Sequence, residues 1–174
     1  MEMGFAIWIT GLPASGKSSI TTELVRALDE QGVKSVVLES DKMRKVLTPV
    51  PAYTAEERDR FYRALAKMGE IISRRGIPVV FDATANRRAY RDYARSLFPQ
   101  FAEVLVDCPL ELCKQRDPKG IYAKAAEGRA DSVPGVQAPF EPPLRPELVL
   151  DCRISPSENA RAIINKLAEL GCLP

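Results

Sequence analysis

The stretch GLPASGKSS (Gly11–Ser19) follows the apolar run FAIWIT (Phe5–Thr10) and precedes a segment with helical spacing. It fits the pattern G-x-x-x-x-G-K-[ST] at every defined position. The glycines of such a loop allow several backbone N–H groups to point at one phosphate, and the following helix adds its positive N-terminal end. Lys17 would neutralise the outer phosphates, and the hydroxyl of Ser18 is suited to Mg²⁺. A chance loop of small residues is the alternative, but the flanking strand and helix patterns favour a nucleotide site.

Strand-like and helix-like segments alternate through most of the chain. Apolar strand patterns occupy residues 5–10, 33–40, 77–83, 101–108 and 147–152, and helical patterns occupy residues 17–31, 54–76, 87–98, 110–116 and 157–171. Thr54, and either Ser155 or Ser157, are suited to cap the helices that follow them. This alternation predicts an α/β fold in which a parallel sheet is covered by helices on both faces.

Residues 117–146 break the alternation, because they contain DPKG, EGRADSVPG and APFEPPLRP without a clear core pattern. A stretch of this length is either disordered or functional. Beside a phosphate loop, we favour a lid that closes over the substrates. We therefore expect a single domain over residues 1–174, with a lid at about 117–146.

The composition argues against several classes of protein. A net charge of +2 over 174 residues does not suit a polybasic nucleic-acid surface. The opening residues lack a basic segment and a long apolar run, so we expect neither a signal peptide nor a membrane span and predict a cytoplasmic protein. The four cysteines form no C-x-x-C pair and the chain has no histidine, which argues against a zinc site and predicts reduced, mostly buried thiols. Without histidine, any general base must be a carboxylate, a lysine, a tyrosine or a thiolate.

Missing motifs narrow the class of nucleotide enzyme. A GTPase switch would carry the guanine-reading string N-K-x-D, and that string does not occur in the chain. A motor ATPase would usually be larger. A small chain with a basic lid is typical of a kinase that closes over two substrates.

Asp41 and Arg44 follow the second predicted strand, and the carboxyl ends of parallel strands face the ligand crevice. Asp41 could orient or deprotonate a substrate hydroxyl, and Arg44 could bind a substrate anion. A helix-start aspartate and a surface arginine are the alternative. On the long helix, spacing alone is typical of a solvated arginine at Arg58 and a core ring at Phe61.

Asp82 ends the strand PVVFD, which has the shape of a Walker B strand whose carboxylate lies behind Mg²⁺. At the start of the irregular region, Arg116 and Lys119 could reach the oxygens of a transferring phosphate. A solvated run of charges is the alternative, but Pro118 and Gly120 favour a shaped turn.

With these residues assembled, nearly the whole chain resembles the adenylylsulfate kinase (APS kinase) family. Three segments resemble that family: GFAIWITGLPASGKSS, CKQRDPKGIYAKAAEG and PGVQAPFEPPLRPELVLDC. The resemblance implies a P-loop kinase fold with a five-stranded parallel sheet, usually dimeric. It also implies transfer of the γ-phosphoryl group of MgATP to the 3′-hydroxyl of adenosine 5′-phosphosulfate (APS), which gives PAPS and ADP.

The motifs and the resemblance together predict a site in four parts. The expected catalytic residues are Lys17, Asp41 and Lys119. The expected ATP-binding residues are Gly11, Leu12, Pro13, Ala14, Ser15, Gly16, Lys17, Ser18, Ser19 and Arg116. The expected acceptor-binding residues are Asp41, Arg44, Arg58, Phe61, Lys119 and Phe140, and the expected Mg²⁺ ligands are Ser18 and Asp82. The expected partners are small-molecule nucleotides and a second copy of the chain, without nucleic acid or membrane.

The departures from the family pattern cluster on the acceptor side. The family's D-G-D-N is Glu39-Ser40-Asp41-Lys42 here, and a substrate-binding asparagine is replaced by Phe61. The family's F-I-S-P is replaced by FDATANRR (81–88), its aromatic-threonine pair by Val133-Pro134, and a later aspartate by Gln137.

Two alternative functions follow from these departures. One is phosphorylation of another nucleotide-linked anhydride, such as cytidine diphosphoramidate. The other is a regulatory protein that binds a nucleotide without catalysis, which the presence of Lys17, Ser18, Asp41 and Lys119 argues against.

Overall fold

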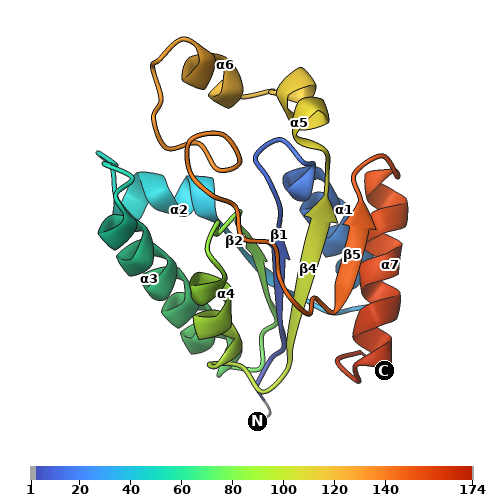
Figure 1. Cartoon of the computed structure of the whole chain (residues 1–174). Helices are drawn as coiled ribbons and strands as arrows, with labels where there is room; N and C mark the ends of the chain where they lie inside the picture. Colours follow the sequence, from blue (N-terminus) through green and yellow to red (C-terminus); the bar gives the residue numbers. More distant parts are fainter. Residues whose placement is uncertain (1–2, 174) are drawn as a thin grey trace.

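A computed structural model describes residues 3–173 of the chain and contains a five-stranded parallel sheet with strand order β2-β3-β1-β4-β5. The strands are β1 (Ala6–Thr10), β2 (Val36–Glu39), β3 (Val79–Asp82), β4 (Phe101–Asp107) and β5 (Leu148–Asp151). The helices are α1 (Lys17–Glu30), α2 (Ser40–Leu47), α3 (Ala55–Ser73), α4 (Arg88–Arg95), α5 (Leu110–Arg116), α6 (Ile121–Ala126) and α7 (Pro156–Glu169). Helices α3 and α4 cover one face of the sheet, and α1 and α7 cover the other (Figure 1). The predicted α/β fold is therefore confirmed.

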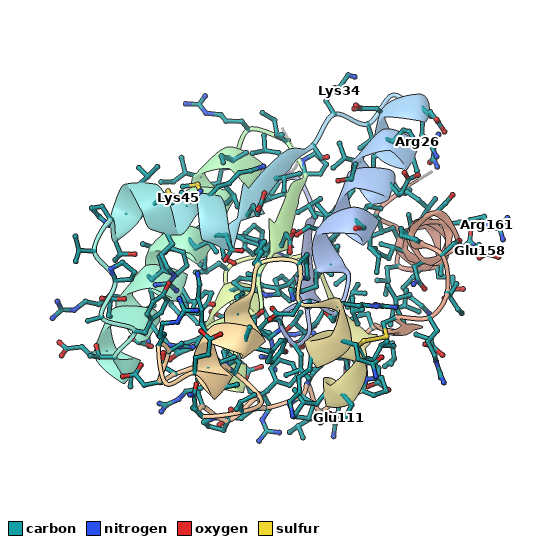
Figure 2. The ribbon with its side chains drawn as sticks, turned by 90° about the horizontal axis from the view of Figure 1, so that it is seen from above. Arg26, Lys34, Lys45, Glu111, Glu158 and Arg161 are labelled. Atoms are coloured by element: carbon teal, nitrogen blue, oxygen red, sulfur yellow. A yellow bond between two sulfur atoms is a disulfide. The ribbon has the colours of Figure 1, made fainter. Side chains whose placement is uncertain are left out.

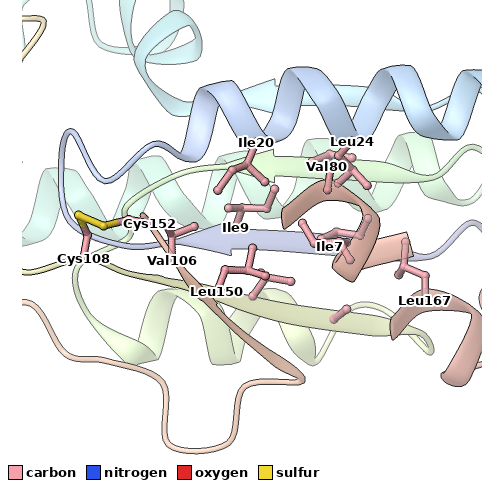
Figure 3. Close-up of a cluster of buried hydrophobic side chains, with 14 of the residues drawn as sticks. Ile7, Ile9, Ile20, Leu24, Val80, Val106, Cys108, Leu150, Cys152 and Leu167 are labelled. Carbon is pink, nitrogen blue, oxygen red and sulfur yellow. A yellow bond between two sulfur atoms is a disulfide. The ribbon is translucent and has the colours of Figure 1, made fainter. Parts of the chain in front are cut away.

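The central strand β1 is buried along its whole length because helices cover both faces of the sheet. Ile7 and Ile9 point into a cluster with Ile20, Leu24 and Val80 (Figure 3). The alternate residues of β1 face the other side, where Trp8 stacks on Phe81 with ring centroids 4.6 Å apart. This two-sided burial explains why the strand reads as a continuous apolar run.

The predicted helix caps are present. The hydroxyl of Thr54 accepts a hydrogen bond from the backbone N–H of Glu57, and that of Ser155 accepts one from Glu158, both at 3.2 Å. Ser155, rather than Ser157, is thus the cap of α7. Each cap satisfies one of the backbone donors that a helix start leaves unpaired.

Two segments differ from the sequence predictions. The second strand was expected over 33–40, but β2 spans only Val36–Glu39, and α2, which was not predicted, begins at Ser40. The expected irregular region contains one short helix, α6, held at its start by the Asp117 carboxylate, which accepts hydrogen bonds from the N–H groups of Ile121 and Ala123. Between residues 3 and 173, no helix is long and apolar enough to cross a membrane.

The prediction of reduced thiols was wrong for two of the four cysteines. Cys108 and Cys152 form a disulfide with their Cα atoms 5.2 Å apart (Figure 3). Each lies one residue beyond a strand end, and Asp107 pairs with Asp151 in the register of β4 and β5. The parallel pairing therefore places the two cysteines side by side, although 44 positions separate them in sequence. Cys113 and Cys172 are free.

We predict that the unfolded, non-reduced protein carries two thiols that react with iodoacetamide, because only Cys113 and Cys172 are free. Mass spectrometry before and after reduction measures this number directly. After reduction, four alkylated cysteines are expected. Four alkylated cysteines before reduction would show that the disulfide does not form.

Candidate active site

The phosphate loop connects β1 to α1 through backbone conformations that restrict its residues. Gly11 and Gly16 have φ angles of 153° and 101°, and Ala14 adopts a φ of 61°. A Cβ atom on Gly11 would lie 2.7 Å from the carbonyl oxygen of Val106 on the neighbouring strand β4. The loop therefore requires glycine at position 11, and the left-handed Ala14 is the kind of strained residue that collects at functional sites.

The side chain of Lys17 lies inside this loop. Its Nζ donates hydrogen bonds to the carbonyl oxygens of Gly11 at 3.1 Å and Leu12 at 2.8 Å. Burial lowers the pKa of Lys17, while the carboxylates of Asp82 and Asp41 act in the opposite direction. Two carbonyl oxygens of the phosphate loop therefore fix the position of the Lys17 ammonium group.

Ser18 and Asp82 meet at the base of the loop. The Ser18 hydroxyl donates a hydrogen bond to Oδ2 of Asp82 at 2.6 Å. Asp82 is at the end of β3, and its partner on β1 is Ile9, so the strand register brings the carboxylate to the loop. Burial raises the pKa of Asp82, against the Ser18 hydrogen bond and the charge of Lys17.

The oxygens of Ser18 and Asp82 fit a magnesium ion better than a zinc ion. Mg²⁺ prefers hard oxygen ligands and is usually held by one or two protein groups together with phosphates and water. Within residues 3–173, no group of three or more His, Cys, Asp or Glu side chains could hold a metal by itself. The donor set present thus suits a metal ion that arrives with a nucleotide.

A cavity of 630 Å³ opens above the loop and collects most of the predicted donor-side and catalytic residues. Its lining includes, from these predictions, Pro13, Ala14, Ser15, Gly16, Lys17, Ser18, Ser19, Asp41, Asp82, Arg116 and Lys119. Leu12 and Phe140 instead line a second cavity of 600 Å³ beside the end of β4. Arg44, Arg58 and Phe61 do not appear in the lining of either cavity.

The predicted lid region contacts α2 at one point and the phosphate loop at another. Lys119 forms a salt bridge with Asp41 at the start of α2, and this contact raises the pKa of Lys119. The hydroxyl of Tyr122 donates a 2.8 Å hydrogen bond to the carbonyl oxygen of Pro13. Seen from above in Figure 2, α5 and α6 lie across the ends of the strands, between α3 and α7. Of the charged residues labelled there, Glu111 belongs to α5, whereas Lys34 and Arg161 lie on the periphery, away from this region.

Arg116 faces the wall of the cavity. Its Nη2 donates a 3.0 Å hydrogen bond to the carbonyl oxygen of Cys152, next to the disulfide. The arginine is thus held at the base of the lid, on the side where β5 ends.

Arg44 and Phe61 are stacked on each other. The guanidinium carbon of Arg44 lies 3.9 Å from the centre of the Phe61 ring, and its Nη1 lies 3.5 Å from a carboxylate oxygen of Glu57. The Phe61 ring is only 3% exposed. It is therefore placed beneath the arginine, and a stacked arginine of this kind gains a cation–π contact.

Arg58 is buried and contacts its own chain. It donates hydrogen bonds to the carbonyl oxygen of Tyr53 at 3.2 Å, to Oδ1 of Asn86 at 3.1 Å and to the carbonyl oxygen of Ser132 at 2.7 Å. The prediction from helix spacing, a solvated arginine at this position, is therefore wrong.

Two buried residues on this side of the site were not among the predicted site residues. Asn86 and Arg91 are 3% and 0% exposed. Arg91 forms a 2.6 Å salt bridge with Glu103 on β4. The only sequence signal was the departure FDATANRR, which contains Asn86 but indicates no partner for it.

Comparison with known proteins gives a consistent match. The family model described as adenylylsulphate kinase matches residues 3–151. A probable adenylyl-sulfate kinase of Pyrococcus abyssi is 37% identical over 172 residues, covering 98% of this chain and 99% of the relative. An adenylyl-sulfate kinase of Rippkaea orientalis is 38% identical, covering 99% of this chain and 96% of the relative. The structure of the Mycobacterium tuberculosis APS kinase CysC in complex with AMPPNP and APS superposes with a TM-score of 0.91 at 32% identity, covering 97% of this chain and 99% of that one.

We predict that Gly11→Ala weakens binding of MgADP by about 10-fold or more, because backbone strain of about 1–3 kcal/mol would displace the loop. Calorimetric titration with MgADP measures this loss. Gly32→Ala is the matched control, since Gly32 also has a positive φ of 76° but a Cβ there meets no atom within 4 Å. It should lower the free energy of unfolding by about 1–2 kcal/mol and leave MgADP affinity unchanged. Equal MgADP affinity in Gly11→Ala and wild type would contradict the assigned loop geometry.

Proposed function

This chain belongs to the adenylylsulphate kinase family, and we propose that it transfers the γ-phosphoryl group of ATP to the 3′-hydroxyl of APS, giving PAPS and ADP. The observation that carries the proposal is the shared cavity, in which the phosphate loop faces both Asp41 and the lid residue Lys119. A kinase needs donor and acceptor groups in one enclosed place, because alignment of the two reactants supplies much of the acceleration.

The donor side is the phosphate loop Gly11–Ser19 with Lys17 at its centre. Backbone N–H groups at the start of α1 face the nucleotide phosphates, and Lys17 balances their charge. We assign Arg116 to the nucleotide as well, since it lines the cavity at the base of the lid.

We further propose that Ser18 and Asp82 hold Mg²⁺ when the nucleotide is bound. The ion supplies neutralisation of the β- and γ-phosphate charge. The Ser18 hydroxyl donates a hydrogen bond to Oδ2 of Asp82, which holds the two oxygens close together at the base of the phosphate loop.

On the acceptor side, Asp41 is the residue that we assign to the attacking hydroxyl. The chain has no histidine, and Asp41 is a carboxylate in the cavity lining within reach of a lid cation. Phosphoryl transfer passes through a loose transition state, so orienting the hydroxyl matters more than removing its proton completely. Lys119 then places a positive charge beside the transferring group, where charge develops.

The remaining acceptor residues are assigned by charge and position. Arg44, supported from below by Phe61, presents a cation for the acceptor anion. Phe140 lies on the lid segment, and Arg58 contacts that same segment at Ser132. Because Phe61 is buried beneath Arg44, we propose that Phe61 acts on the acceptor through Arg44.

Three broader features remain proposals. We treat residues 1–174 as one domain in which about 117–146 act as the lid. The family resemblance implies a homodimer, which the mass of the protein in solution would test. A cytoplasmic location is expected for an enzyme whose substrates are the small-molecule nucleotides ATP and APS.

The experiment that tests the function is a coupled ADP-release assay with product identification by mass spectrometry. APS, cytidine diphosphoramidate and simple alcohols are offered as acceptors with MgATP, and Lys17→Ala serves as the blank. PAPS formation from APS at the highest kcat/KM supports the proposal. Phosphorylation of cytidine diphosphoramidate without PAPS formation would support the kinase activity but contradict APS as the acceptor.

We predict that Asp41→Asn lowers turnover by about 10²–10⁴-fold, the usual effect of removing an acid–base group. The affinity for ATP should change little. Asp29→Asn is the matched control, because Asp29 is also an exposed aspartate paired with a lysine, Lys34, but is not part of the cavity lining. Turnover of Asp41→Asn within a few-fold of wild type would remove Asp41 from the mechanism.

A further inference from the structure

The side chain of Asn86 joins two parts of the acceptor side. Asn86 follows β3 and is 3% exposed. Its Oδ1 accepts a hydrogen bond from Nη1 of Arg58 at 3.1 Å, and its Nδ2 donates one to the carbonyl oxygen of Pro139 at 2.9 Å. Its backbone carbonyl oxygen accepts a 2.7 Å hydrogen bond from the N–H of Glu141. The residue therefore contacts both neighbours of Phe140 and a basic residue of α3.

Arg58 extends the same connection to the other end of this lid segment. Its Nη2 donates to the carbonyl oxygen of Ser132, and its Nε donates to that of Tyr53. Together, Asn86 and Arg58 tie residues 132–141 to α3 and to the loop after β3. Because both side chains are at least nine-tenths buried, water competes little for these hydrogen bonds.

The loop that carries Asn86 is itself held in place by hydrogen bonds that the preceding residue, Ala85, forms with Tyr62 and Arg91. The N–H of Ala85 donates to the hydroxyl of Tyr62 at 3.2 Å, and Ala85 has a positive φ of 41°. Arg91 donates to the carbonyl oxygens of Ala85 and Glu141, and its charge is paired with Glu103. Because separating the buried pair of Arg91 and Glu103 would leave an uncompensated buried charge, Arg91 holds Ala85 and Glu141 firmly in place.

The side chain at position 86 must accept a hydrogen bond from the guanidinium of Arg58 and, at the same time, donate one to the carbonyl oxygen of Pro139. An amide meets both requirements. A carboxylate accepts only, and an alkyl group does neither.

We propose that Asn86 is a positioning residue for the acceptor, which holds Arg58 and the Phe140 segment as a preformed wall of the acceptor site. Lid opening is then confined to the residues before Ser132. The inference rests on the proposed function for the identity of the acceptor, but not for the existence of the wall.

Two variants of Asn86 test the inference in the full-length protein. Asn86→Asp keeps the acceptor for Arg58 but places an oxygen against the carbonyl oxygen of Pro139. Asn86→Ala removes both hydrogen bonds. We expect each variant to raise the KM for APS by about 10- to 100-fold, the effect of losing buried hydrogen bonds to charged or carbonyl groups, with kcat and the KM for ATP nearly unchanged. If Asn86→Ala does not fold, Asn86→Asp alone provides the test.

Asn159→Ala is the matched control for stability. Asn159 is also 3% exposed, and its Nδ2 donates to the carbonyl oxygens of Asp151 and Ile154, on the opposite side of the sheet. It should lower stability comparably while leaving the KM for APS unchanged. An equal rise in the KM for APS in Asn159→Ala, or a parallel loss of kcat and ATP affinity in the Asn86 variants, would overturn the inference.

Hydrogen exchange separates this inference from the proposed function. In the ligand-free protein, both Asn86 variants should speed amide exchange within residues 132–141 and leave α7 unchanged. Faster exchange there supports the preformed wall even if wild-type protein makes no PAPS. Exchange equal to wild type would overturn the inference whatever the acceptor is.

Discussion

The seam between β1 and β3 fixes both halves of the site. Besides the backbone hydrogen bonds between the two strands, two side chains of β1 bond to residues that follow β3. The indole N–H of Trp8 donates to the carbonyl oxygen of Ala83 at 3.1 Å, and the hydroxyl of Thr10 donates to the carbonyl oxygen of Thr84 at 2.6 Å. The phosphate loop leaves one strand of this seam, and the loop that carries Asn86 leaves the other. Since side chains alternate along a strand, a slip of one residue would turn Asp82 away from Ser18.

The two halves use different physical means to hold their side chains. On the donor side, backbone geometry dominates. Gly11 has no room for a Cβ atom, and the side chain of Lys17 is hydrogen-bonded to carbonyl oxygens of its own loop. On the acceptor side, side-chain contacts dominate, with Arg44 on Phe61 and Arg58 on Asn86. The departures from the family pattern cluster in the second half, although the segment 81–88 also contains Asp82, which meets Ser18 on the donor side.

The donor half could be predicted from the sequence because its determinants are local. The loop, its flanking strand and helix, and the short helix Leu110–Arg116 all depend on residues adjacent in the chain. Asp41 shows how two interpretations can coincide: it lies in the first turn of α2 and also lines the cavity.

The remaining features depend on contacts between distant residues, which no local pattern encodes. The disulfide follows from the register of β4 and β5. Asn86 reaches Arg58, 28 positions away, and Pro139, 53 positions away. The spacing on α3 places Phe61 in the interior but contains no information that Arg44 lies above it. These contacts became visible only with the strand order and the path of the lid segment.

The central claim is that one cavity aligns a donor phosphate with an acceptor hydroxyl. A crystal structure of the protein with ADP and APS tests this claim most directly. The account predicts the 3′-hydroxyl of APS within hydrogen-bond distance of Asp41, its anionic group beside Arg44, and an unchanged hydrogen bond between Asn86 and Arg58. APS ordered away from both Asp41 and Arg44 would contradict it.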